Sequence, residues 1–149
     1  MTNANLLKTS YVEDLHIGME ASLTKKVQEK DVLSFSEISG DKNPVHLDEA
    51  FAKTTRFKER IAHGLLSASF ISAVFGMKMP GPGSIYLSQT LQFKAPVKIG
   101  DTVTAKVKVK NIDLNRARVI FETTCSVGEL LVITGEAELL VPKRPATSL

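Results

Sequence analysis

The sequence predicts an α+β fold in which a curved antiparallel sheet wraps around one buried helix. After residue 84, apolar and polar residues alternate with a period of two, which is typical of strands with one buried and one solvent-facing side. Before that point the spacing is helical, and the segment from Gly64 to Met77 is apolar nearly all round. This helix is the one element apolar enough to cover the apolar face of such a sheet.

The elements before the sheet follow from their spacing and their end signals. A first strand is expected from Met19 to Val27, and a helix from Glu29 to Ser39 with Gly40 as its C-terminal stop. A short helical turn is expected from Leu47 to Lys53, because acidic residues in its first turn suit the helix dipole. The apolar helix from Gly64 to Met77 then ends before a Pro- and Gly-rich break.

The alternating half of the chain predicts the strands of the sheet. Turns around Gly100, Asn115 and Gly128 are expected to join neighbouring strands directly. The buried faces are expected to comprise Ile85, Leu87, Gln89, Leu91 and Phe93; Val103, Ala105, Val107 and Val109; the odd positions from Val119 to Val127; and Leu131, Ile133, Gly135, Ala137, Leu139 and Val141.

Bulk composition limits the function classes. The 149 residues are 43% hydrophobic and 23% charged, and we expect one domain over residues 1–149. The net charge of +3 is small and scattered and Trp is absent, which argues against nucleic-acid binding. No apolar run reaches the roughly 20 residues of a membrane span, and the N-terminus lacks a signal or transit pattern. We therefore expect a cytoplasmic protein without a membrane segment.

Cysteine and histidine usage argues against a metal centre. Cys125 is the only cysteine, so no internal disulfide is possible, and its strand pattern indicates a small buried thiol. One Cys and three His exclude the standard Cys/His zinc spacings. No metal ligand is assigned.

The segment Gly40-Asp41-Lys42-Asn43-Pro44-Val45-His46 carries the clearest chemical signal. It places a carboxylate and an imidazole five residues apart in a loop that proline stiffens. Such a pair can take a proton from water and deliver one elsewhere, which typically contributes about 10²- to 10⁴-fold in rate. Asp41 has an alternative role as a cap of the Asn43-Pro44 turn. We favour catalysis because His46 and the helix that begins at Gly64 accompany it.

These residues resemble a known family. The run from Phe35 to His46 resembles the signature of the MaoC-like or (R)-specific enoyl-CoA hydratases, and the similarity continues through Ala62-His63-Gly64-Leu65-Leu66, Pro80-Gly81-Pro82-Gly83-Ser84 and Leu91-Gln92-Phe93. The resemblance implies the hot-dog fold and reversible syn addition of water to a trans-2-enoyl thioester. It implies a homodimer. It implies no metal or redox cofactor, and coenzyme A arrives as part of the substrate. Short bacterial members divert β-oxidation intermediates toward hydroxyalkanoate polymers.

The expected catalytic residues are Asp41, His46, Gly64 and Ser72. Asp41 and His46 are expected to hold one water and to share the acid and base roles, in an order the sequence leaves open. The Gly64 N–H opens the apolar helix, where unpaired amides and the dipole favour a developing oxyanion. Ser72 matches the family position whose hydroxyl supports the pair; its alternative is a bond within its own helix.

The expected substrate contacts are Asn43, His63, Leu65 and Leu66. Leu65 and Leu66 would line the acyl tunnel. His63 has two alternatives: a second catalytic base, or a residue that holds the turn ahead of Gly64.

Three other functions stay open at this point. A hot-dog thioesterase would bind the same acyl-CoA but hydrolyse it, and it has no evident use for the Asp–His spacing. A 3-hydroxyacyl-ACP dehydratase would differ in carrier and direction. A non-catalytic acyl-CoA-binding module would be stabilised by ligand without turnover.

Overall fold

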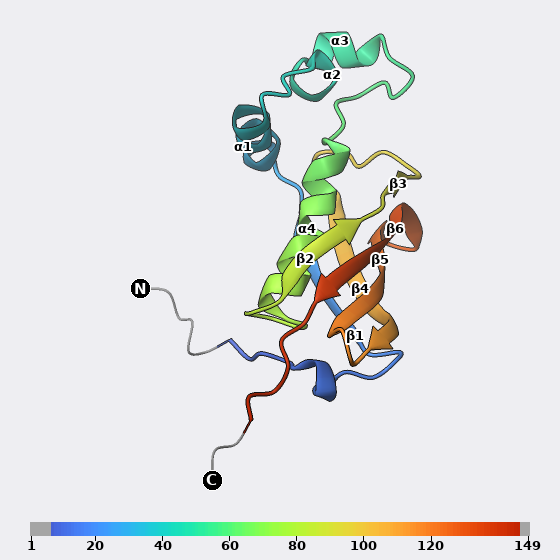
Figure 1. The fold of residues 1–149 in the computed structure, drawn as a ribbon. Helices are drawn as coiled ribbons and strands as arrows, with labels where there is room; N and C mark the ends of the chain where they lie inside the picture. Colours follow the sequence, from blue (N-terminus) through green and yellow to red (C-terminus); the bar gives the residue numbers. More distant parts are fainter. Residues whose placement is uncertain (1–6, 147–149) are drawn as a thin grey trace.

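The structure, a computed structural model, describes residues 7–146 and confirms the α+β class (Figure 1). Among these residues, no helix is long and apolar enough to cross a membrane. In chain order the elements are a 3₁₀ turn at Val12–Asp14, β1 Glu20–Lys26, α1 Glu29–Ser39, α2 Pro44–Leu47, α3 Glu49–Lys53, α4 Gly64–Met77, β2 Ile85–Gln89, β3 Gln92–Phe93, β4 Thr102–Asp113, β5 Arg118–Val127 and β6 Leu130–Leu140.

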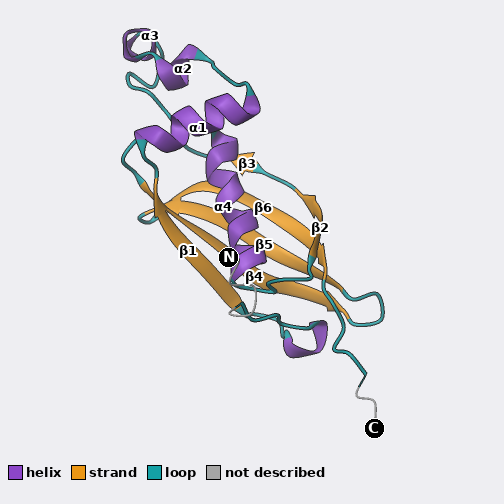
Figure 2. Ribbon diagram, turned by 90° about the vertical axis from the view of Figure 1, so that its left-hand side faces the viewer, coloured by secondary structure: helices purple, strands orange, loops and turns teal. Residues whose placement is uncertain are grey.

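The strands form one antiparallel sheet in the order β1-β4-β5-β6-β2, and the short β3 also pairs with β6. Figure 2 shows α4 running across one face of this sheet, between the edge strands β1 and β2. Ile71 and Val74 of α4 are completely buried, as are Val103 and Val107 of β4 and Phe121 of β5. Each such side chain contributes about 1.5–3 kcal/mol through burial. The predicted sheet around a central helix is therefore confirmed.

Helix α4 has the predicted bounds, but it is not buried all round. Its sheet-facing residues are buried, whereas Leu65 is 58% and Met77 56% exposed in the single chain. The neighbouring edge strand β2 exposes Ile85 and Leu87. An apolar helix can leave one face uncovered by its own chain when another surface is available to cover it.

Three details of the predicted elements were wrong. The single turn from Leu47 to Lys53 is two helices, because Asp48 ends α2 and its side chain caps α3. The predicted strand from Ile85 to Phe93 is split between β2 and β3. The turn around Gly100 leads to β4, which pairs with β1 and β5 rather than with β3. The other two turns do join sheet neighbours.

The alternation in β6 is also interrupted. Cys125 faces Ile133, but the next residue of β5 faces Leu131, so Val132 is an extra residue in a β-bulge. A bulge reverses which side chains point inward on either side of it. Val132 is accordingly buried and Leu131 is 47% exposed, against the prediction that Leu131 belongs to the buried face.

Helices α1, α2 and α3 lie beyond the N-terminal end of α4 (Figures 1 and 2). Gly40 ends α1 in the left-handed conformation, with φ of 80°. Asn43 then caps α2, whose first residue is Pro44. These two turns fold the segment from Asp41 to His46 back toward the start of α4.

Candidate active site

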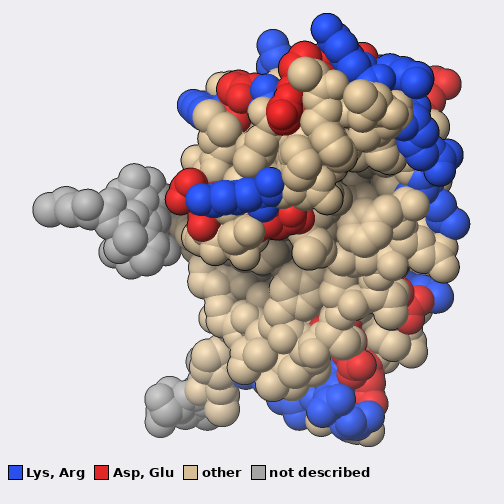
Figure 3. All heavy atoms as spheres, turned by 90° about the horizontal axis from the view of Figure 1, so that it is seen from above, with Lys and Arg blue, Asp and Glu red and all other residues tan. Residues whose placement is uncertain are grey.

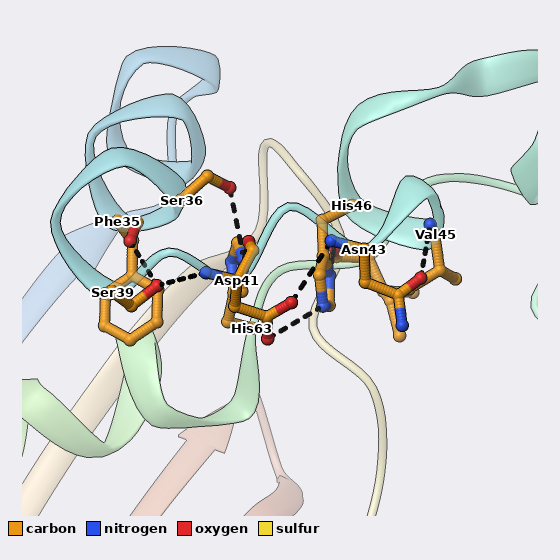
Figure 4. A network of polar contacts seen from close by, with 9 residues as sticks. Phe35, Ser36, Ser39, Asp41, Asn43, Val45, His46 and His63 are labelled. Atoms are coloured by element: carbon orange, nitrogen blue, oxygen red, sulfur yellow. Dashed lines mark hydrogen bonds and ion pairs between the residues drawn. The ribbon is translucent and has the colours of Figure 1, made fainter.

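A cavity of about 740 Å³ opens at the N-terminal end of α4. Its wall includes the predicted catalytic residues Asp41, His46 and Gly64, together with His63 and Leu65. The volume lies in the range of small-molecule sites, about 300–1,000 Å³. Figure 4 shows the polar network of this wall, with the Asp41 carboxylate pointing toward the His46 ring.

The Asp41 carboxylate uses its two oxygens for different purposes. Oδ1 accepts the Asn43 N–H at 3.2 Å, which caps the turn. The Asp41 N–H donates to Ser39 Oγ at 3.1 Å and ties the loop to the end of α1. Oδ2 remains 4.0 Å from His46 Nε2. The capping and catalytic alternatives for Asp41 are therefore compatible, because the cap orients the second oxygen.

The His46 ring has a defined tautomer. Nδ1 lies 2.7 Å from the Ile61 carbonyl oxygen, and a carbonyl only accepts, so Nδ1 carries the proton. Nε2 then presents its lone pair to the cavity. His46 is 8% exposed, and burial is the main reason why its pKa lies below the usual 6.5; nearby His63 lowers it further, while the Ile61 carbonyl and Asp41 oppose the shift.

Arg60 holds the turn that carries His46. Its Nε donates to the His46 carbonyl oxygen at 2.7 Å. Its two terminal nitrogens donate to the two carboxylate oxygens of Glu29, at 2.9 and 2.8 Å. A bidentate pair of this kind fixes geometry as well as charge. The start of α1 and the turn that carries His46 are thereby joined.

His63 ties the same loop to the start of α4. Its Nε2 lies 2.9 Å from the Asp41 carbonyl oxygen and 3.2 Å from Ser36 Oγ, so Nε2 carries the proton and donates. Its ring stacks on His46 with centroids 3.8 Å apart and an interplanar angle of 25°. His63 thus holds the Asp41 loop rather than capping α4, to which its side chain makes no cap bond.

The pair leaves room for one hydrogen-bonded molecule. Asp41 Oδ2 and His46 Nε2 both accept hydrogen bonds, and 4.0 Å is too long for a direct bond. A water that donates one hydrogen to each acceptor satisfies both groups. The arrangement can bind and deprotonate such a water, which is general base catalysis.

The same side chains are unsuited to a metal ion. Ligand atoms of Asp41, His46 and His63 lie within 4.8 Å of one another. However, the two imidazole rings are stacked, and a ring nitrogen binds a metal in its own plane at about 2.0–2.1 Å. Stacked rings with centroids 3.8 Å apart and an interplanar angle of 25° do not direct their in-plane lone pairs at one ion.

Gly64 is the first residue of α4, so its N–H has no helical acceptor. A Cβ built on Gly64 would lie 2.6 Å from Cδ1 and Cε1 of Phe93, which is closer than real contacts allow. Glycine therefore allows the Phe93 ring to pack over the start of the helix. The ring and this N–H line the same cavity.

Comparison with known proteins shows the family of the chain. The family described as "MaoC like domain" matches residues 14–129, a range that includes Asp41, His46 and the residues that hold them in place. The chain belongs to the MaoC-like family. An (R)-specific enoyl-CoA hydratase from Rhodospirillum rubrum is 52% identical over 142 residues, covering 95% of this chain and 99% of the relative. A 3-hydroxybutyryl-CoA dehydratase from Methylorubrum extorquens is 51% identical over 138 residues, covering 93% of this chain and 88% of the relative.

Solved structures of MaoC-like relatives have the same fold. The R-hydratase PhaJ1 from Pseudomonas aeruginosa superposes with a TM-score of 0.88 at 40% identity, covering 96% of this chain and 98% of that one. The (R)-hydratase from Aeromonas caviae, described as involved in PHA biosynthesis, gives a TM-score of 0.85 at 43% identity, covering 87% and 99%. The predicted family and hot-dog fold are confirmed.

Three residues predicted for the MaoC-like site lie elsewhere. The Asn43 side chain accepts the Val45 N–H at 3.1 Å as the cap of α2, and Asn43 is not in the cavity wall. Leu66 is buried in the core. Ser72 lies about 12 Å along the helix axis from Gly64 and faces a second, more open hollow beside β2. Within one chain, Ser72 therefore cannot support the Asp41–His46 pair.

Sequence reasoning missed several groups that shape the MaoC-like site. Ser36 has a usable signal, because it follows one turn after Val32 on the buried side of α1. The sequence gives no signal for the Ile61 carbonyl, because every residue has a backbone carbonyl group. Buried polar atoms without a partner among the described residues are His63 Nδ1 and Ser67 Oγ, and both residues belong to the cavity wall.

Proposed function

We propose that this protein adds water to trans-2-enoyl-CoA to form (R)-3-hydroxyacyl-CoA, reversibly, as an (R)-specific enoyl-CoA hydratase. Curated relatives of that name match nearly the whole chain. The observation that carries the proposal is the 4.0 Å space between two hydrogen-bond acceptors, Asp41 Oδ2 and His46 Nε2, in the wall of a cavity. One activated water is what hydration requires.

The proposed reaction begins with a water bound between the pair. Its oxygen attacks C3 of the enoyl thioester, and the pair accepts one water proton as the C3–O bond forms. The π electrons of the double bond move toward C2 and the thioester carbonyl. The pair then returns a proton to C2, so hydrogen and hydroxyl arrive from one side and the addition is syn. Because the two groups are coupled, the separate acid and base roles stay open.

Negative charge on the thioester oxygen needs a donor, and we assign this role to the Gly64 N–H. The amide lies at the positive end of α4 and in the same wall as the pair. One preorganised donor of this type is worth about 10²- to 10³-fold in related acyl chemistry. His63, Leu65 and the Phe93 ring are the proposed contacts to the substrate.

The proposal uses no metal or redox cofactor, and CoA belongs to the substrate. Acid–base chemistry at one water suffices for hydration, which involves no net oxidation. Thioester hydrolysis would also use an activated water at this site; the relatives named as hydratases favour hydration, and the reaction product distinguishes the two.

We also propose a homodimer. Strand β2 is an edge of the sheet and exposes Ile85 and Leu87, while the adjacent face of α4 exposes Leu65 and Ser72. Unpaired apolar edge strands readily pair with another chain. In such a dimer Ser72 faces the partner chain, and it can support a catalytic pair only from across the interface. The cytoplasmic location and a role in supplying polymer precursors stay predictions.

A hydration assay tests the proposed function. Incubation with crotonyl-CoA should remove the enoyl absorbance without releasing free thiol, and the product should be (R)-3-hydroxybutyryl-CoA. Free CoA with an unchanged acyl group would instead support a thioesterase. Ligand-dependent thermal stabilisation without turnover would support a binding module.

A further inference from the structure

Two cationic side chains line the cavity without a role in the proposed chemistry. Arg56 lies in the loop after α3, and Lys94 follows β3. Both are exposed, so their charged ends lie at the opening rather than on the floor. Figure 3, the view onto this end of the molecule, shows a hollowed and largely uncharged area whose border carries Lys and Arg side chains, with Asp and Glu among them.

These two cations have no carboxylate partner among the described residues. Within residues 7–146, neither Arg56 nor Lys94 forms an ion pair, whereas nearby Arg60 pairs with Glu29 and Lys98 pairs with Glu59. The Arg56 guanidinium instead lies 5.9 Å from the centre of the Phe57 ring, which also lines the cavity. A guanidinium without an ion-pair partner, beside a partly buried aromatic ring, suits a phosphate joined to a stacking base.

The described wall of the cavity carries one negatively charged side chain in addition to these two cations. Asp41 is the one carboxylate among the described residues of the wall, and it belongs to the catalytic pair. A phosphorylated substrate is repelled from this carboxylate and attracted to Arg56 and Lys94. The uncharged acyl thioester is thereby directed toward the pair.

We propose that Arg56 and Lys94 form a phosphate-binding site for the nucleotide end of coenzyme A, with the Phe57 ring available to the adenine. This proposal rests on the proposed hydratase function. It predicts a preference for free CoA thioesters over carrier-protein thioesters, because the nucleotide end of CoA carries more phosphate charge than the single phosphodiester of a carrier protein.

The test compares three crotonyl thioesters whose carriers differ in phosphate content. Crotonyl-CoA carries the nucleotide phosphates, crotonyl-pantetheine carries none, and crotonyl-acyl-carrier-protein carries one phosphodiester. The variants are Arg56→Gln and Lys94→Gln. Matched controls are Arg116→Gln, in the turn between β4 and β5, and Lys78→Gln, after the C-terminal end of α4; neither residue is in the cavity wall.

We expect each cavity variant to reduce the preference for crotonyl-CoA over crotonyl-pantetheine in kcat/KM by about tenfold, through KM, since a lost charge-assisted bond costs about that factor. The control variants should retain the wild-type preference. The preference should also decline with added salt, because exposed charges are screened.

Three outcomes would overturn the assignment. Equal losses on both small thioesters would mean that the cations act on the acyl end or on folding. Unchanged preference would mean that they do not bind phosphate. Loss confined to the carrier-protein thioester would mean that they form a protein-docking surface.

A binding measurement separates this proposal from the proposed function. Adenosine 3′,5′-bisphosphate, which lacks the thioester, should bind the wild type in calorimetry and bind Arg56→Gln about tenfold more weakly. If no thioester is hydrated but this binding pattern holds, the hydratase function fails and the phosphate site stands. If hydration occurs without bisphosphate binding, the phosphate site is wrong and the hydratase function stands.

Discussion

Replacing Asp41 by Asn removes one acceptor from the pair and little else. Asn retains an oxygen that can accept the Asn43 N–H, so the turn cap seen at 3.2 Å survives. Its amide nitrogen would face His46 Nε2 in place of Oδ2, which lies 4.0 Å away. The nitrogen donates rather than accepts, so the water loses one of the two groups that orient it and receive its proton.

The expected loss in kcat follows from that change. A positioned acid–base group contributes about 10²- to 10⁴-fold, equivalent to about 2.7–5.5 kcal/mol in the activation barrier. Stability should change by less than about 1 kcal/mol, because the carboxylate is exposed and the cap is kept. The assay is the initial rate of crotonyl-CoA hydration, with the thermal midpoint of each protein measured beside it.

Asp48→Asn is the matched control. Asp48 also caps a short helix, since its Oδ1 accepts the Phe51 N–H at 3.1 Å, but it is not in the cavity wall. The same substitution there should preserve kcat. A folded Asp41→Asn protein with kcat within about threefold of the wild type would refute the role of this carboxylate.

The remaining predictions concern titration, burial and assembly. Because the pKa of His46 lies below 6.5, the ring is neutral at pH 7, and kcat/KM should fall on the acid side with a midpoint below 6.5; a midpoint above 6.5 would contradict this. Burial raises the pKa of Cys125 to about 12, so a thiol reagent should label it only after denaturation, and rapid labelling of the native protein would contradict its burial. Ser36→Ala, which removes a buried bond to His63, should lower the free energy of unfolding in urea by about 1 kcal/mol, whereas an unchanged value would show the bond is not stabilising. Ile85→Lys on the edge strand should convert the dimer to a monomer in light scattering, and a monomeric wild type would exclude the dimer.

Local sequence was sufficient for the elements whose signals are local. The α1 and α4 bounds were predicted as observed, because glycine, capping and periodicity act within a few residues. The alternation of apolar and polar residues predicted burial incorrectly where pairing with a neighbouring strand shifts the register. Leu131 follows the alternation of its strand, yet pairing with β5 introduces a bulge at Val132 that turns Leu131 outward. Likewise, Ser72 was predicted to support the pair, but it lies about two helical turns beyond Gly64 and faces a different hollow.

Local sequence places a carboxylate and an imidazole in one proline-stiffened loop ahead of an apolar helix, because only five residues separate them. How the two groups are oriented depends on contacts with distant segments. The Ile61 carbonyl selects the His46 tautomer from 15 residues away, and His63 holds the Asp41 loop from 22 residues away. These contacts depend on how distant segments pack, which local spacing does not specify.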